Sequence, residues 1–181
     1  MSDMLYNFSQ WLASTWISPF AINLNDTAVS QWLDTHSFAI PVMQVIHIFA
    51  LSTGFGAVLM IDLRVFNLAG TDRTFAETER RYVRWIWWSL LVLLITGIGM
   101  TVAEPPRELI NPIFWIKMPT VAFAALVSLW FHNFVMRRLS AGGKVGAGTV
   151  LGALFVLALW LLIMFMGRWI AYAPTSGDAL Q

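Results

Sequence analysis

Long runs of apolar residues dominate the pattern of hydrophobic and polar positions along this chain. Asp, Glu, Lys and Arg are absent from four of these runs, which cover residues 35–61, 85–103, 118–135 and 145–167. About 20 apolar residues in a helix cross about 30 Å of hydrocarbon, and a helix pairs its own backbone groups in lipid. The pattern predicts an all-α fold, an integral membrane four-helix bundle with spans over residues 38–66, 82–103, 113–137 and 145–171.

A different periodicity precedes the first span. Apolar residues at positions 5, 8, 12, 16 and 20 recur at three- and four-residue spacing, with polar residues between them. This spacing is typical of an interfacial amphipathic helix, which we expect to end near Pro19. The predicted organisation is a periplasmic N-terminal segment over residues 1–36, a four-span domain over residues 37–173 and a tail over residues 174–181. Thr74 and Glu77 have capping-box spacing, which predicts a helix start before the second span.

The composition supports the membrane prediction and narrows the chemistry. Hydrophobic residues make up 58% of the 181 positions and charged residues only 12%, and the mean hydropathy is +0.68. The chain has no cysteine, so a cofactor must be held by His, Met, Lys, carboxylate or backbone groups. No nucleophile–base motif, phosphate-binding loop or nucleic-acid-binding patch is visible in the sequence. Hydrolase, transferase and nucleic-acid-binding functions therefore find no support.

Positive charge gathers in two connections of the predicted bundle. Eight of the eleven Lys and Arg residues follow the first or the third span: Arg64, Arg73, Arg80, Arg81, Arg84, Arg137, Arg138 and Lys144. By the positive-inside rule these connections face the cytoplasm. We therefore expect a multi-pass protein of the bacterial inner membrane with both termini in the periplasm.

Ionisable side chains inside a span are functional candidates because they are costly in lipid. His47 lies fifteen residues before Asp62, whereas His132 lies only five before Arg137. The two imidazoles therefore differ by about 15 Å in depth, which argues against one haem held by both. At the depth of His47 the other spans offer Lys117, together with the methionines Met100, Met118, Met164 and Met166. His47 is either a haem ligand or a hydrogen-bonded core histidine.

His132 lies near charged residues at the cytoplasmic side. His132 is expected to join Asp62, Arg64 and Arg138 in a polar network, in which Asp62 orients the ring or pairs with an arginine. A structural role for this network and a second haem or metal site both stay open.

Several strings in the spans resemble a known family. IPVMQVIHIFALSTGFGAVLMIDLRVFNLAG, NPIFWIKMPTVAFAALVSLWFHNFVMRR and GRWIAY are similar to a widespread family of uncharacterised four-helix bacterial membrane proteins, over residues 30 to 173. The pattern of His47, Lys117 and Phe131-His132 more distantly resembles the haem-binding membrane protoporphyrinogen oxidase and the copper-resistance membrane proteins. The oxidase resemblance implies haem binding and activity for His47 and Lys117.

Three hypotheses about function follow from these residues. The first is a membrane b-type haem protein, in which His47 ligates haem b and Lys117 or a methionine completes or anchors the site. It would pass electrons between quinone or another redox partner and an acceptor, and any enzyme activity would be that of an oxidoreductase. The second is a non-catalytic accessory or anchor subunit of a larger membrane complex or homo-oligomer. The third is copper handling by Met and His.

Overall fold

The structure is a computed structural model, which describes residues 2–141 and 143–172. Every regular element in these ranges is helical. Along the chain the elements are α1 (Ser2–Ala13), α2 (Ile17–Asn25), α3 (Ala28–Thr35), α4 (Ala39–Val65), α5 (Phe75–Ala103), α6 (Pro105–Leu109), α7 (Pro112–Ser140), α8 (Ala147–Trp169) and the 3-10 helix η1 (Ile170–Tyr172). The predicted all-α fold is confirmed. The expected tail over residues 174–181 lies outside the described residues.

Four of these helices have the length and composition of membrane spans. α4, α5, α7 and α8 contain 27, 29, 29 and 23 residues, and each includes a strongly apolar window. At 1.5 Å per residue even the shortest is about 35 Å long, enough to cross a bilayer. Leu94, Leu126 and Phe165 on these helices are between 60% and 67% exposed, as expected for side chains that contact lipid. The prediction of a multi-pass membrane protein is confirmed.

The segment before the first span is divided more finely than the sequence pattern predicts. The expectation of one helix that ends near Pro19 is wrong, because α1 ends at Ala13 and α2 begins at Ile17. Pro19 therefore lies in the first turn of α2. Proline is tolerated there because the first N–H groups of a helix have no partner within it.

The connection between α4 and α5 is set by local signals. Asn67 has a positive φ of 59°, a left-handed conformation that stops α4. The Glu77 carboxylate accepts hydrogen bonds from the Thr74 backbone N–H at 2.8 Å and from its hydroxyl at 2.9 Å. The Glu77 N–H in turn donates to Thr74 Oγ1 at 3.3 Å. The predicted capping box is confirmed, and α5 begins at the next residue, Phe75.

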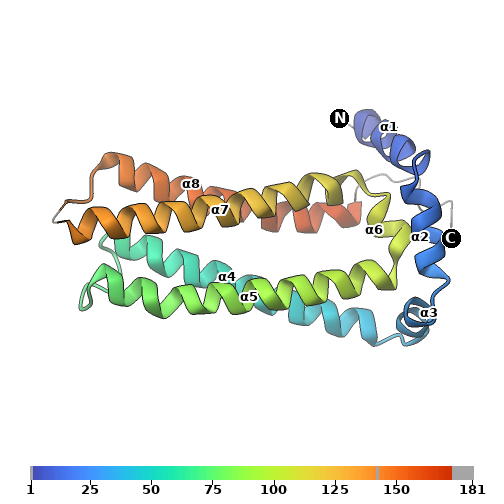
Figure 1. Cartoon of the computed structure of the whole chain (residues 1–181), viewed down its shortest axis with the longest axis horizontal. Helices are drawn as coiled ribbons and strands as arrows, with labels where there is room; N and C mark the ends of the chain where they lie inside the picture. Colours follow the sequence, from blue (N-terminus) through green and yellow to red (C-terminus); the bar gives the residue numbers. More distant parts are fainter. Residues whose placement is uncertain (1, 142, 173–181) are drawn as a thin grey trace. The chain divides into compact units, whose positions relative to one another are not determined.

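The chain forms two compact units, and each long helix contributes to both. Unit 1 comprises residues 1–48, 92–119 and 165–181, as far as they are described. Within it α2 packs against α6, as Figure 1 shows. Leu12, Ile17, Ala21 and Leu109 form a buried cluster between these segments. The Asn111 side-chain amide donates to the backbone carbonyl of Ile170 at 3.0 Å, which ties the start of α7 to η1.

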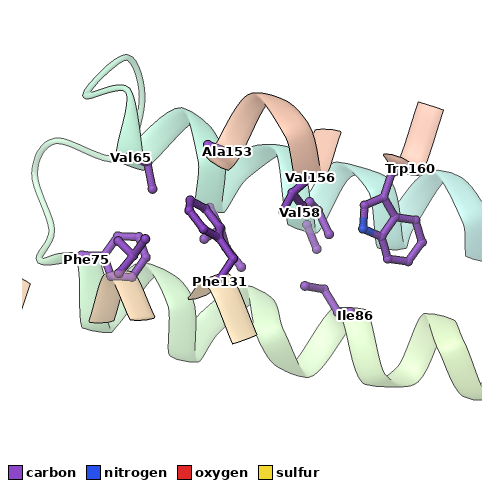
Figure 2. Close-up of a cluster of buried hydrophobic side chains, with 11 residues drawn as sticks. Val58, Val65, Phe75, Ile86, Phe131, Ala153, Val156 and Trp160 are labelled. Carbon is purple, nitrogen blue, oxygen red and sulfur yellow. The ribbon is translucent and has the colours of Figure 1, made fainter. Parts of the chain in front are cut away.

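Unit 2 comprises residues 49–91 and 120–164 and holds the largest hydrophobic core. Figure 2 shows that all four long helices contribute to this core, with Val58 and Val65 from α4, Phe75 and Ile86 from α5, Phe131 from α7, and Ala153, Val156 and Trp160 from α8. Within this unit the chain is therefore a four-helix bundle, as predicted. The α4–α5 and α7–α8 connections lie at the same end of the unit (Figure 1).

Candidate functional site

His47 is a polar group in the membrane-spanning part of unit 1. It lies on α4 and is half-buried, and its Nδ1 is 2.7 Å from the hydroxyl oxygen of Thr96 on α5. That hydroxyl donates its one hydrogen to the backbone carbonyl of Val92, one turn earlier, at 2.7 Å. With the hydroxyl hydrogen on the Val92 carbonyl, the Thr96 oxygen accepts from His47, and the matching tautomer carries the ring hydrogen on Nδ1. The other ring nitrogen, Nε2, then keeps a free lone pair, as a metal-ligating histidine requires.

Two glycines of α5 adjoin side chains of α4 in the same region. A Cβ added at Gly97 would lie 3.8 Å from Cε1 of His47, which is ordinary contact, whereas one at Gly99 would lie only 2.7 Å from the sulfur of Met43. Met43 is one turn before His47 and so lies on the same side of α4. The thioether of Met43 is therefore near the histidine face, held against a glycine that no larger residue could replace without movement.

Lys117 of α7 is the second ionisable group of this region. It is half-buried, and it is close enough to both His47 and Glu108 to interact with them electrostatically. A Cβ added at Gly167 of α8 would lie 3.5 Å from the Lys117 Nζ. The ammonium therefore lies beside a position of α8 that has no side chain. The predicted pair His47 and Lys117 therefore lies within the range of electrostatic interaction in unit 1.

Glu108 is an acidic partner for Lys117. It lies on α6, outside the spanning helices, and is half-buried. Burial raises the pKa of the Glu108 carboxyl above its ordinary value, whereas the positive charges of Lys117 and Arg107 oppose that rise. The lysine therefore has an acidic neighbour in the same unit.

The two methionines named with His47 differ in their surroundings. Met100 follows Thr96 by four residues and so lies on the same face of α5 as the hydroxyl that holds His47. It is half-buried. Met118 directly follows Lys117 and is 42% exposed, so helical spacing turns it about 100° away from the lysine. Of the two, Met100 shares a face with the His47 contact.

Asp62 and His132 form a buried pair in unit 2. The Asp62 side chain is completely buried and that of His132 is 3% exposed, and Nε2 of His132 lies 3.6 Å from Oδ1 of Asp62. This distance is too long for a hydrogen bond. Among the described residues, neither Asp62 oxygen nor His132 Nε2 has a hydrogen-bond partner. The pair joins α4 to α7 while leaving hydrogen-bonding capacity unused.

The structure does not bring the predicted arginines to this pair. Arg64 instead donates to the backbone carbonyl of Arg73 at 3.0 and 2.8 Å and to the Asn67 side chain at 3.1 Å. Arg138 is exposed near the end of α7, where its carbonyl accepts from Gly143. Arg64 therefore stabilises the α4–α5 connection. The ionisable group next to Asp62 is His132 and not an arginine.

The donors of this region differ from those of a bare-metal site. Among residues 2–141 and 143–172, no three His, Asp or Glu side chains gather where they could hold a metal. Haem needs only one or two axial side chains, and histidine with methionine is an accepted pair. His47 has the required free Nε2, and it belongs to unit 1 whereas His132 belongs to unit 2.

Sequence reasoning missed the residues that surround the candidates. Thr96 and Met43 adjoin His47 or its helix face, and Glu108 adjoins Lys117. Thr96 had a visible signal, because a polar residue within a charge-free run needs a partner. Met43 and Glu108 had none, because their roles depend on contacts between helices far apart in sequence.

Comparison with known proteins gives one match. Residues 36–173, about three-quarters of the chain, match the sequence model of a family of unknown function (DUF6644). Comparison with curated proteins and with solved structures finds no match.

Proposed function

This chain belongs to a family of unknown function (DUF6644), and we propose that it is a membrane b-type haem protein that takes part in electron transfer or a haem-dependent redox step. The observation that carries the proposal is the hydrogen bond from His47 Nδ1 to Thr96, whose own hydrogen is already donated to Val92. It fixes the ring orientation and leaves Nε2 as a ligand atom within a membrane-spanning helix. Such outer-shell partners are typical of metal-bound histidines.

The second contact to the haem would come from the same unit. Lys117 is near His47, and a lysine either ligates iron when neutral or binds a propionate when charged. The thioethers of Met43 and Met100 lie on the helix faces that carry His47 and Thr96, and Met118 is a further candidate. His47 would ligate the iron, Lys117 or a methionine would complete or anchor the site, and the apolar helices would exclude water.

Haem supplies a one-electron redox centre when it is bound. The residues of this chain set its ligation and its surroundings. Thr96 keeps the His47 ring in one orientation, and Gly97 leaves room beside its Cε1 atom. Redox partners would include a quinone or another electron carrier, and any enzyme activity would be that of an oxidoreductase.

The location that we propose is the bacterial inner membrane, with both termini in the periplasm. The basic connections after α4 and α7 lie at one end of unit 2 (Figure 1). Arginine and lysine near span ends favour the cytoplasmic side. His47 then lies in the periplasmic half of its span.

The proposal is tested by visible spectroscopy of the full chain. The protein would be expressed with ample haem supply, purified in mild detergent and measured in oxidised and dithionite-reduced forms. We expect a Soret band and sharp reduced α and β bands, which disappear in His47→Ala. His36→Ala is the matched control, because His36 is engaged locally with the Trp32 carbonyl at 2.7 Å. A featureless spectrum from the wild type would overturn the proposal and favour a non-catalytic accessory subunit.

A further inference from the structure

Unit 2 contains a cavity beside the Asp62–His132 pair. Its volume is about 240 Å³, and residues of α5 and α7 line it together with Trp160 of α8. The residues that matter here are Glu79, Trp87, Ser128, His132, Asn133 and Trp160. The cavity belongs to a part of the molecule that the proposed haem site does not use.

The size and walls of the cavity suit a single planar ring. Pockets for drug-sized ligands measure about 300–1,000 Å³, so a cavity of 240 Å³ is too small for a porphyrin but holds one substituted ring. The indoles of Trp87 and Trp160 border it, and the remaining walls are largely aliphatic. An aromatic or quinonoid ring packs well on such surfaces.

The lining of this cavity includes polar groups that are engaged and polar groups that remain available. Trp160 donates to the Ser128 hydroxyl at 3.0 Å, and Ser128 donates to the Ala124 carbonyl at 2.6 Å, so these two groups are already engaged. Glu79, His132 and Asn133 are the other polar side chains of the lining. Asn133 is exposed on a spanning helix, where a bare amide is costly unless it finds a partner.

A buried carboxylate, that of Asp62, lies next to the His132 ring. This carboxylate is completely buried, both of its oxygens lack hydrogen bonds among the described residues, and it faces Nε2 of His132. At 3.6 Å the carboxylate does not hydrogen-bond to the ring, but a shift of a few tenths of an ångström would let it accept from Nε2 and orient His132 toward a ligand. A buried acid without hydrogen bonds is costly, which favours a functional reason for its presence.

The charges of the cavity disfavour anionic ligands. No lysine or arginine is among its lining residues, whereas Glu79 is, and Asp62 lies just behind His132. A phosphate headgroup would therefore meet carboxylates without a cation to pair with. A neutral ring whose oxygens accept hydrogen bonds in one redox state and donate them in the other meets no such repulsion.

We propose that this cavity binds the headgroup of a lipid-soluble quinone, with His132 and Asn133 at the ring oxygens and Trp87 and Trp160 against the ring. The quinone would enter from the bilayer, since the lining belongs to membrane-spanning helices. This inference deepens the proposed redox function, on which its meaning rests, by naming the class of electron carrier.

The experiment is photoaffinity labelling of the full chain in lipid nanodiscs with an azido-substituted short-chain benzoquinone, followed by peptide mapping. We expect label on residues 79–90 or 125–133, with competition by the unsubstituted benzoquinone. Affinity for that competitor should fall about tenfold in Asn133→Leu and in His132→Ala, the effect of losing one buried hydrogen bond. Asn133→Leu alters an exposed side chain and so avoids a folding defect.

Adjacent tryptophans provide the matched control. Trp87→Ala should weaken binding about tenfold, whereas Trp88→Ala should leave it unchanged, since Trp88 is similarly exposed but is not part of this lining. Label elsewhere, equal affinity in Trp87→Ala and Trp88→Ala, or displacement by lipid alone would overturn the inference. The assay needs no haem, so its failure would leave the spectral test of His47 unaffected.

Discussion

At the scale of single residues, the hydrogen bonds around His47 decide what its ring can do. A threonine in a helix usually donates to a carbonyl one turn earlier, and Thr96 does so at 2.7 Å. With this bond made, Thr96 offers its oxygen as an acceptor to His47 and favours the imidazole tautomer with the hydrogen on Nδ1. The Val92 carbonyl of α5 thus influences, through Thr96, which nitrogen of His47 on α4 carries the hydrogen.

Thr96→Val should loosen haem binding without changing the shape of the site. The variant removes the acceptor of the His47 N–H but keeps a β-branched side chain, so ring orientation is lost. We expect haem to transfer to apomyoglobin about ten times faster than from the wild type, the usual effect of losing an outer-shell partner. Thr101→Val is the control, because Thr101 donates only to the Gly97 carbonyl. Equal transfer rates in the two variants would contradict this role of Thr96.

Glu108 makes a prediction about pH. Burial raises its pKa above the ordinary value of 4.5, so the folded state holds the proton more tightly than the unfolded state does. The stability that this proton provides is fully present below pH 4.5 and is lost as pH rises through the raised pKa.

We therefore expect the unfolding midpoint in mixed detergent micelles to fall with rising pH in this window, and to fall less in Glu108→Gln. Asp34→Asn, which removes an exposed carboxylate of α3, should keep the wild-type slope. A slope unchanged by Glu108→Gln would show that another group is responsible.

At the scale of elements, close approach between helices depends on particular glycines. A Cβ at Gly152 of α8 would clash with Cε2 of Phe131 on α7, a buried ring of the unit 2 core. Four residues earlier on the same helix, a Cβ at Gly148 would meet nothing within 4 Å. The two positions therefore differ in packing, although both are glycines on the same helix.

Gly152→Ala should destabilise the protein by about 1–3 kcal/mol, because the Phe131 ring must move in a filled core. Gly148→Ala should be neutral or slightly stabilising, because alanine favours helix where there is space. Thermal unfolding followed by circular dichroism compares the two. Equal midpoints for both variants would contradict the packing of α7 against α8.

At the scale of the whole molecule, the sequence predicted the elements better than their contacts. Apolar runs and a capping box located the four spans and the start of α5, because these signals are local. The break between α1 and α2 was missed, since Pro19 signals a helix start as readily as an end. The proximity of Asp62 and His132 was expected from their positions near the same end of their spans, and the structure places them 3.6 Å apart. Helical spacing alone cannot tell which side chains meet across helices, so the contact of His47 with Thr96 became visible only in the fold.

The measurement that tests the central claim most directly is the haem content of the purified full chain by the pyridine haemochrome assay, in the wild type, His47→Ala and His132→Ala. We expect stoichiometric haem b in the wild type and in folded His132→Ala, and a loss of about tenfold or more in His47→Ala. A wild type without haem, or haem that is kept in His47→Ala and lost in His132→Ala, would contradict the assignment of the ligand to His47.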